Sequence, residues 1–343
     1  MTPDLRILGA GVFGLSCAIA ALRRGARVVV HDPHGPGAGA SGGVLGALAP
    51  HVPEPWNAKK QFQLDALLMG RAFWPQVEAW SGLATGYVAS GRLQPLPEGG
   101  ETVARSRGAA ASVRWRGEAS WEVIPAKGAA WEPPAPEGLL IHDTLSAHLH
   151  PARTVRAMAA AVHALGGRVM RSAAPEDAVP AIHATGVSGL AELSEGLSRP
   201  VGVPVKGQAA VLGLAAEGPQ LFVDGIHLVP HSDGTVAVGS TTENGAGTVS
   251  TDGALDDLVE RVRRAVPVLR EAPVIRRWAG LRPRARTRAP MLGEWPGRPN
   301  QFIANGGFKI GFGVAPLVGE VMADLALNGI DRIPQGFRVA DSL

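Results

Sequence analysis

The chain has 343 residues, of which 45% are hydrophobic and 18% are charged, and a formal net charge of +3 at pH 7. A single hydrophobic core stops growing at about 250–300 residues, so this length predicts two domains. Lysine and arginine are scattered along the sequence, so nucleic-acid binding is not expected. The single cysteine, Cys17, excludes a disulfide, a cysteine zinc site and a cysteine redox pair within one chain. No metal site is expected.

No stretch approaches the roughly 20 apolar residues that a membrane helix needs. Residues 7–22 could pass for the apolar part of a signal peptide, but they contain three glycines and lack a cationic start. The sequence therefore predicts a cytoplasmic protein with no membrane span.

The first predicted elements are a strand, a glycine turn, a helix and a second strand. The strand at 5–8 is apolar at Leu5, Ile7 and Leu8, the helix continues to Leu22, and the strand with the β-branched run at 28–30 ends at Asp32. The turn contains three glycines in the G-x-G-x-x-G spacing: Gly9, Gly11 and Gly14. Such a turn lets a pyrophosphate approach the helix N-terminus, and an acid about 20 residues later can accept the ribose hydroxyls. This unit predicts dinucleotide binding, and Asp32 favours FAD or NAD over NADP.

A glycine-rich stretch, 33–50, follows the second strand. It is too flexible for a regular element and is typical of a loop that wraps a ligand. Residues 62–80 then carry apolar side chains at helical spacing. Short strand-like pieces broken by proline and glycine predict a separate sheet. They lie at 91–97, 112–117 and 138–143.

Residues 151–165 return to a helical pattern, with Pro151 in the first turn, and a short strand follows at 168–170. From residue 200 the pattern is again sheet-like, with a hairpin turn at 232–234. A helix at 255–266 follows, capped by Thr251 or Asp252.

The last section, 274–328, is predicted to contain an arginine-rich linker, a strand at 301–306, a glycine turn and an apolar helix entered at Pro316. Elements typical of a nucleotide-binding unit therefore alternate with elements of a second sheet. A simple NAD enzyme would more often complete one domain before the other.

Four separated segments together resemble the D-amino acid oxidase family of FAD-dependent oxidoreductases, which includes glycine oxidase and sarcosine oxidase. They are GAGVFGLSCAIAALRRGARVVVHD at 9–32, GASGGVLGALAP at 39–50, HLVPHSDGTVAVGSTTE at 227–243 with WAGLRP at 278–283, and NGGFKIGFGVAP at 305–316. The resemblance covers nearly the whole chain.

The resemblance implies an α/β fold in which a Rossmann-type, glutathione-reductase-like FAD-binding domain is interleaved with a substrate domain built on a mixed or antiparallel β-sheet. In this division, residues 1–85, 141–199 and 276–343 form the discontinuous FAD-binding domain. Residues 86–140 and 200–275 form the substrate domain.

The resemblance also implies which residues hold FAD. In the family, the first glycine turn, an Ala-Ser-Gly segment, an Ala-Thr-Gly turn and a C-terminal glycine loop line the cofactor. The matching positions are Gly9, Gly11, Val12, Phe13, Gly14, Asp32, Ser41, Gly42, Gly46, Ala47, Thr185, Gly186, Gly280, Gly306, Gly307, Phe308, Lys309 and Ile310. Sarcosine oxidases tether FAD to a cysteine, and no cysteine lies at 305–313, so the expected FAD is noncovalent.

In the family the substrate carboxylate is held by an arginine of the Gly-Leu-Arg-Pro segment and by a second cation from the final loop. These correspond to Arg282 and Lys309, and the planar fork of an arginine suits the two oxygens of a carboxylate. His51 directly follows the GASGGVLGALAP segment at 39–50, which in the family lies along the flavin, and could also face the substrate. Family members that use a tyrosine for the carboxylate have no match, because the only tyrosine here is Tyr87.

The expected protein is an enzyme, an FAD-dependent amino acid or amine oxidase or dehydrogenase. It would oxidise a small amino acid or secondary amine, of the glycine, sarcosine or D-amino acid type, to an imine by hydride transfer to flavin N5, with dioxygen or another electron acceptor. One alternative is an oxidase of the tRNA carboxymethyl-uridine-modifying type. Another, from a different class, is an NAD-dependent dehydrogenase or a nucleotide-binding regulatory protein. The sequence leaves open the substrate, the acceptor, the oligomeric state and how the short segment 168–183 covers the adenine.

Overall fold

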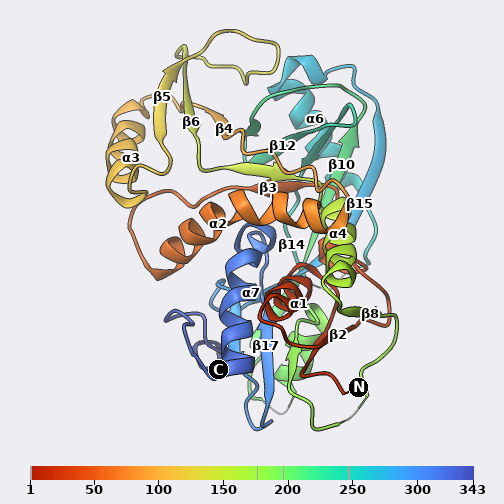
Figure 1. Ribbon diagram of the computed structural model, residues 1–343. Coiled ribbons are helices and arrows are strands. Elements are labelled where there is room, and N and C mark those ends of the chain that lie inside the picture. Colours follow the sequence, from red (N-terminus) through yellow and green to blue (C-terminus); the bar gives the residue numbers. More distant parts are fainter. Residues whose placement is uncertain (1, 176, 196, 246–247) are drawn as a thin grey trace.

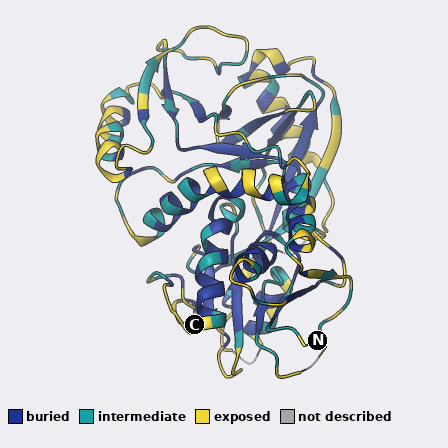
Figure 2. Cartoon of the chain, in the orientation of Figure 1, coloured by how far each residue is buried: buried dark blue, intermediate teal, exposed yellow. Residues whose placement is uncertain are grey.

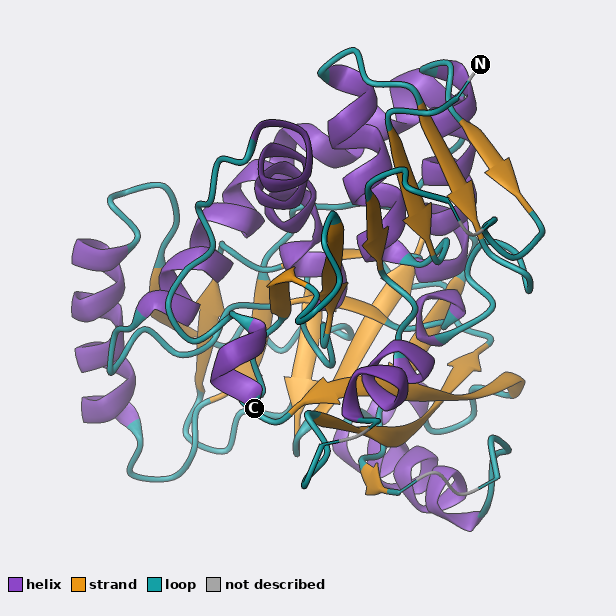
Figure 3. Cartoon of the chain, turned by 90° about the horizontal axis from the view of Figure 1, so that it is seen from below, coloured by secondary structure: helices purple, strands orange, loops and turns teal. Residues whose placement is uncertain are grey.

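The computed structural model describes residues 2–175, 177–195, 197–245 and 248–343, which form two large β-sheets with helices around them (Figures 1 and 3). The first sheet has six strands in the order β16-β17-β9-β1-β2-β8, and its pairs are parallel except for β16 with β17. Its strands come from three separate regions of the chain. They are β1 (Leu5–Leu8), β2 (Val28–His31), β8 (Arg168–Met170), β9 (Ala181–His183), β16 (Met291–Glu294) and β17 (Gln301–Asn305).

Helix α1 (Val12–Arg23) follows β1 and is enclosed on all sides. It packs against α7 (Gly311–Asn328) and α4 (Pro151–Ala164), and ten of its 12 residues are buried, as its dark blue ribbon shows (Figure 2). This explains why its sequence is apolar all round rather than along one stripe. The contact with α7 is close, because a Cβ at Gly319 would lie 2.5 Å from the carbonyl oxygen of Ser16.

The second sheet has nine strands in the order β14-β10-β13-β12-β11-β4-β6-β5, with β15 paired to β10. Its pairs are antiparallel except for β4 with β11. The strands are β4 (Arg92–Pro95), β5 (Trp121–Pro125), β6 (Leu139–Asp143), β10 (Gly202–Leu212), β11 (Gln220–Val223), β12 (Ile226–His231), β13 (Thr235–Gly239), β14 (Glu243–Asn244) and β15 (Val274–Ala285).

The remaining elements cover or connect the two sheets. Helix α6 (Gly253–Ala265) packs on β10 and β13, α3 (Glu101–Arg114) packs on β5, and α2 (Ala58–Ser81) packs on α7 and α4. The others are α5 (Val187–Ser194), the two-stranded pair β3 (Gly46–Leu48) and β7 (Ala147–Leu149), and short 3-10 turns at Ala40–Gly42, Pro267–Leu269 and Val339–Ser342. Among the described residues, no helix is both long and apolar enough to cross a membrane.

The interleaved α/β architecture expected from the sequence is confirmed, as are several local elements. Helix α4 begins at Pro151, the turn between β12 and β13 lies at 232–234, and Asp252 rather than Thr251 caps α6 by accepting a hydrogen bond from the backbone N–H of Ala254. These elements carry strong local signals: a proline in the first helical turn, a Ser-Asp-Gly turn and a carboxylate cap.

Residues 101–114 form α3, so the strand-like interpretation of 112–117 is wrong. The helix lies on the surface and buries only Ala104 and Ala111, which leaves no apolar periodicity to identify it. The flanking strands β4 and β6 belong, as expected, to a sheet separate from the six-stranded one, because β4 pairs with β6 and with β11 of the nine-stranded sheet.

The arginine-rich segment at 274–285 is strand β15 rather than a linker, and the domain boundary expected at 276 falls within it. The strand is held by backbone pairing to β10, so its outward positions can be arginines. The glycine-rich stretch 33–50 contains a 3-10 turn and β3. Helix α5 was not expected. Helix α7 begins at Gly311 rather than at Pro316; no side chain caps its first turn, so the sequence carries no signal for its true start.

We expect Gly319→Ala to destabilise the fold by ~1–3 kcal/mol, because the added methyl group would push α7 away from the backbone of α1, and this outweighs the gain of ~1 kcal/mol in helix propensity. Urea unfolding measures the change. The matched control is Gly253→Ala in α6, where an added Cβ meets nothing within 4 Å and stability should stay level or rise. Equal stability of both variants would contradict the close α1–α7 contact.

Candidate functional site

A large cavity of about 1380 Å³ lies at the carboxyl edge of the parallel strands and extends to the second sheet. Its walls include the turns that follow β1, β2, β8, β9 and β17, at residues 9–13, 32–34, 172–174, 184–188 and 305–309. This edge is where α/β sheets bind nucleotides. The volume exceeds the ~300–1000 Å³ of a pocket for a drug-sized ligand, so there is room for a dinucleotide and a second small molecule.

Most of the residues expected to form the site line this cavity. They are Gly9, Gly11, Val12, Phe13, Asp32, Ser41, Gly42, Gly46, Ala47, Thr185, Gly186, Gly280, Arg282, Gly306, Gly307, Phe308 and Lys309. Three others do not line it: Gly14, Ile310 and His51. Gly14 supports the first turn from behind, and Ile310 immediately precedes α7 and packs against the core.

The first glycine turn has the three roles that its spacing predicts. Gly9 has a φ of +102°, and a side chain there would overlap the carbonyl oxygen of Ala184. A side chain at Gly14 would overlap the carbonyl oxygen of Gly9. Gly11 differs, because its φ is −80° and an added Cβ would meet only the Ser41 side chain, at 3.2 Å. Gly11 therefore leaves open space at the N-terminus of α1, where a phosphate could accept backbone N–H groups.

The carboxylate of Asp32 lines the cavity and organises the turns around it. It accepts hydrogen bonds from the backbone N–H groups of Ala10 (2.8 Å), His34 (2.9 Å) and Gly35 (3.1 Å). A carboxylate has about four lone-pair sites, so these bonds leave roughly one for a ribose hydroxyl. Asp32 thus has a structural role, and its remaining lone-pair site is compatible with the ribose role expected from the sequence.

The other turns present small residues and one unpartnered hydroxyl. A side chain at Gly42 would overlap the carbonyl oxygen of Gly37, and one at Gly46 would overlap that of Leu149, so these glycines serve backbone packing. Thr185 lines the cavity, but its hydroxyl is buried against Gly189 and has no hydrogen-bond partner among the described residues. The open space at Gly11, beside the backbone N–H groups at the N-terminus of α1, fits a ligand rich in hydrogen-bond-accepting oxygens, such as a dinucleotide.

The final loop places an aromatic ring and a cation on the cavity wall. Phe308 has a φ of +43°, a left-handed conformation that is uncommon for a bulky residue and clusters at functional sites. Its ring centroid lies 5.7 Å from the Arg284 guanidinium carbon and 5.7 Å from the Lys309 ammonium nitrogen. Burial lowers the pKa of Lys309, and the nearby charge of Arg282 lowers it further.

Arg282 reaches the cavity from β15. Its Nη1 donates a hydrogen bond of 3.2 Å to the carbonyl oxygen of Thr241, and its guanidinium lies over Gly207, where a side chain would overlap it. Burial lowers the pKa of Arg282 to about 10, and Glu243 acts in the opposite direction. In the described part of the chain, neither Arg282 nor Lys309 has a carboxylate within ion-pair distance.

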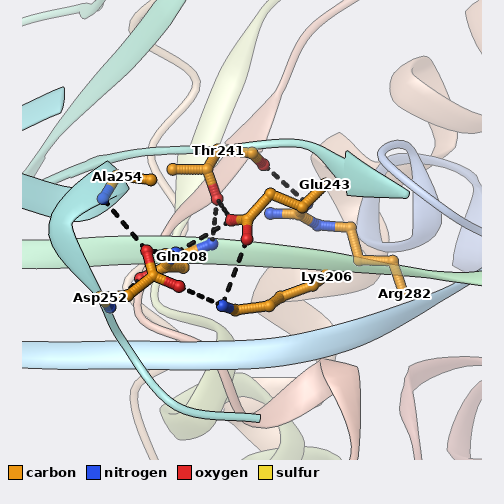
Figure 4. Close-up of polar contacts among 7 residues, drawn as sticks. All are labelled: Lys206, Gln208, Thr241, Glu243, Asp252, Ala254 and Arg282. Carbon is orange, nitrogen blue, oxygen red and sulfur yellow. Dashed lines mark hydrogen bonds and ion pairs between the residues drawn. The ribbon is translucent and has the colours of Figure 1, made fainter. Parts of the chain in front are cut away.

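A polar network next to Arg282 fixes the segment that follows β13 (Figure 4). Lys206 lies 2.5 Å from an oxygen of Asp252 and 3.2 Å from one of Glu243. The Gln208 amide donates to both carboxylates, and the Thr241 hydroxyl donates to Glu243 at 2.7 Å. The bond from Gln208, followed by that from Lys206, lowers the pKa of Asp252 to about 2.

His51 does not reach the cavity wall. Its ring nitrogen Nδ1 lies 2.6 Å from the side-chain oxygen of Gln63, to which its backbone N–H also donates. Three residues outside the expected set, His227, Phe222 and Trp278, also line the cavity, from the second sheet. His227 and Trp278 belong to the segments at 227–243 and 278–283 that carry the family resemblance, and this position is the one sequence signal that points to them.

Comparison with known proteins gives a family match over most of the chain. The family model described as DAO, FAD dependent oxidoreductase, matches residues 4–325. A bifunctional ThiO/ThiG protein of Nostoc sp. (strain PCC 7120) is 27% identical over 361 residues, which cover 96% of this chain and 53% of that protein. The glycine oxidase of Geobacillus kaustophilus is 26% identical over 358 residues, which cover 94% of this chain and 92% of that protein.

A solved structure of a glycine oxidase from Geobacillus kaustophilus matches with a TM-score of 0.82 at 21% identity, covering 98% of each chain. At this identity the likeness shows the fold. The chain spans about half the length of the bifunctional relative that it matches.

We expect Gly11→Val to lose the bound dinucleotide, because the branched side chain would fill the space beside the N-terminus of α1. The fold should persist, since the backbone at Gly11 is ordinary and an added Cβ meets only the Ser41 side chain. Circular dichroism checks the fold, and chromatography of the heat-released cofactor measures occupancy. Gly11→Ala, with its smaller side chain, should retain more cofactor. Full occupancy in Gly11→Val would show that the phosphates bind elsewhere.

Proposed function

The chain belongs to the DAO family of FAD-dependent oxidoreductases, and from this premise we propose that it oxidises a small amino acid or secondary amine to an imine. The observation that carries the proposal is the pair of cations, Arg282 and Lys309, on one wall of the cavity beside the final glycine loop. Two cations without a carboxylate partner in the described chain suit a substrate that brings its own carboxylate.

Arg282 is well placed for this role. The bond from its Nη1 to the Thr241 carbonyl orients the guanidinium but leaves its charge uncompensated by a direct ion pair. Glu243, the nearest acid of the network, already accepts bonds from Thr241 and Gln208 and pairs with Lys206. A partly buried arginine of this kind gains most from a planar, bidentate carboxylate.

We further propose that FAD is held noncovalently by the residues that line the turns of the first sheet. When bound, FAD supplies a hydride acceptor at flavin N5. The N-terminus of α7 opens onto the cavity at Gly311 and Phe312. Its N–H groups, together with Lys309, would stabilise the negative charge of a reduced flavin bound in the cavity. Cys17, the one cysteine in the sequence, is buried in α1 and does not line the cavity.

The protein contributes orientation rather than acid–base chemistry in this proposal. Arg282 and Lys309 fix the substrate carboxylate, which sets the direction of the α-carbon and its hydrogen. The imine product leaves the enzyme and reacts with water. Dioxygen or another acceptor takes up the electrons, and the relatives named as glycine oxidases favour a substrate as small as glycine.

The direct test is to purify the protein and identify its cofactor and substrates. We expect a yellow protein that releases FAD on heating and that turns over one or more of glycine, sarcosine and small D-amino acids. The products should be the oxo acid together with ammonia, or with an amine where the substrate is a secondary amine. Oxygen consumption without an added acceptor separates an oxidase from a dehydrogenase. A protein that binds NAD but no flavin would overturn the proposal.

We expect Arg282→Ala to keep its flavin but to bind simple carboxylates much more weakly. Losing one partner of a buried charge pair costs ~2–5 kcal/mol, which at ~1.4 kcal/mol per decade is about thirtyfold to several thousandfold in affinity. Lys309→Met should also weaken binding and, because a positive charge near the flavin is lost, lower the flavin reduction potential. Titration of acetate, followed by flavin absorbance, measures the affinity.

The matched control is Arg277→Ala on the same strand. Arg277 is exposed, pairs with Asp256 and does not line the cavity, so its variant should bind acetate as the wild type does. Equal acetate affinity in the wild type and in Arg282→Ala would place the carboxylate site elsewhere.

A further inference from the structure

His227 stands on the cavity wall at the end that carries the two cations. It is the second residue of β12, its ring packs on that of Phe222 with centroids 4.6 Å apart, and Lys309 is close enough for its charge to act on the imidazole. The ring nitrogen Nδ1 lies 3.1 Å from Oε1 of Gln220. The position of the ring is therefore fixed both by stacking and by a hydrogen bond.

The hydrogen bonds of Gln220 determine which nitrogen of His227 carries the proton. Gln220 is fully buried, and its amide nitrogen donates to the carbonyl oxygens of Ala147 (2.8 Å) and Leu48 (3.4 Å). The opposite orientation of the amide would place its oxygen against two carbonyl oxygens, which only accept hydrogen bonds. Oε1 must therefore face His227, and because Oε1 only accepts, Nδ1 must carry the hydrogen.

The imidazole is neutral at physiological pH. Burial is the main cause that lowers the pKa of His227, to about 3, and the charges of Arg92 and Lys309 lower it further. A neutral ring with hydrogen on Nδ1 has a lone pair on Nε2. Within the described ranges, Nε2 has no hydrogen-bond partner, and the ring lines the cavity. This end of the cavity thus combines two cations with one uncharged acceptor.

We propose that Nε2 of His227 accepts a hydrogen bond from the amino group of the substrate. The inference rests on the proposed function and extends it: Arg282 and Lys309 take the carboxylate, and His227 takes the only hydrogen-bond donor that a small amino acid or secondary amine offers. Fixing both ends of the substrate determines the orientation of the α-carbon between them. Gln220 does not touch the substrate and acts as the positioning residue that sets the tautomer of His227.

The test compares two ligands that differ only in the amino group and are not oxidised: 2-aminoisobutyrate, which has no α-hydrogen, and isobutyrate. Both are titrated into the FAD-loaded enzyme and followed by flavin absorbance. In the wild type we expect 2-aminoisobutyrate to bind about tenfold more tightly than isobutyrate, the effect of one hydrogen bond of ~1.4 kcal/mol.

Two variants separate the acceptor from the rest of the ring. His227→Asn can keep the bond to Gln220 but has no acceptor at the place of Nε2, so the two ligands should bind equally. His227→Gln can place a side-chain oxygen near that position and should restore part of the preference. Isobutyrate affinity and FAD content should stay close to wild type in both, which also shows that both variants are folded.

A tenfold preference that survives in His227→Asn, or a wild type without any preference, would overturn the role of His227 while leaving the carboxylate site intact. Failure of the wild type to bind either ligand would overturn the carboxylate site and, with it, this inference. Loss of the preference in His227→Asn with unchanged isobutyrate binding supports the inference, because a merely structural role would weaken both ligands together.

Discussion

The cavity depends on how closely the backbone turns approach one another at the carboxyl edge of the six-stranded sheet. Gly9 lies against the carbonyl of Ala184 with no room for a side chain, and the backbone N–H of Ala10 donates to Asp32 across the edge. The Asn305 amide ties the last turn to Gly186, since it donates to that carbonyl at 2.8 Å. These contacts bring segments far apart in sequence into one surface of backbone groups and small residues, which is the surface that a pyrophosphate and a flat ring system require.

The second sheet supplies the larger side chains, and small residues make the space for them. Strand β15 pairs with β10 along its length, with Gly280 opposite Gly207 and Arg282 opposite Val205. The guanidinium of Arg282 occupies the place that a side chain at Gly207 would take, and the indole of Trp278 packs against Gly280. Glycines therefore serve one purpose on the first sheet, where backbones approach, and another on the second, where they admit an arginine and a tryptophan.

The sequence predicted those parts of the fold and site that depend on local signals. The G-x-G-x-x-G turn, Asp32 and the final loop are encoded by short segments whose residue types are restricted by the backbone, and the structure brings them to one cavity. Helix α3 and strand β15 were missed or misassigned because each presents polar residues to solvent, so neither shows an apolar pattern. Their position is set by tertiary contacts that no local window contains.

The two histidines show the same limit within the site. His51 directly follows the segment at 39–50 in sequence, yet its ring is hydrogen-bonded to Gln63 and does not line the cavity. His227 lies far along the chain from the glycine turns of the six-stranded sheet, and it reaches the wall because β12 runs alongside β11 in the second sheet. Its tautomer depends on Gln220, whose own orientation depends on the carbonyl groups of Ala147 and Leu48. Proximity to the segment at 39–50 therefore did not identify the histidine on the cavity wall, although His227 is the first residue of another family-like segment, 227–243.

The distribution of charge explains how Arg282, which is partly buried, can remain available to a ligand. The acids nearest to Arg282 are engaged elsewhere: Glu243 accepts from Thr241 and Gln208, and both Glu243 and Asp252 pair with Lys206 (Figure 4). If Glu243 paired directly with Arg282 instead, a substrate carboxylate would have to displace it and gain little. Because the acids are held in a network of their own, the charge of Arg282 has no ion-pair partner in the described chain. This is the condition that the proposed carboxylate substrate requires, and it is set by hydrogen bonds of the segment that follows β13.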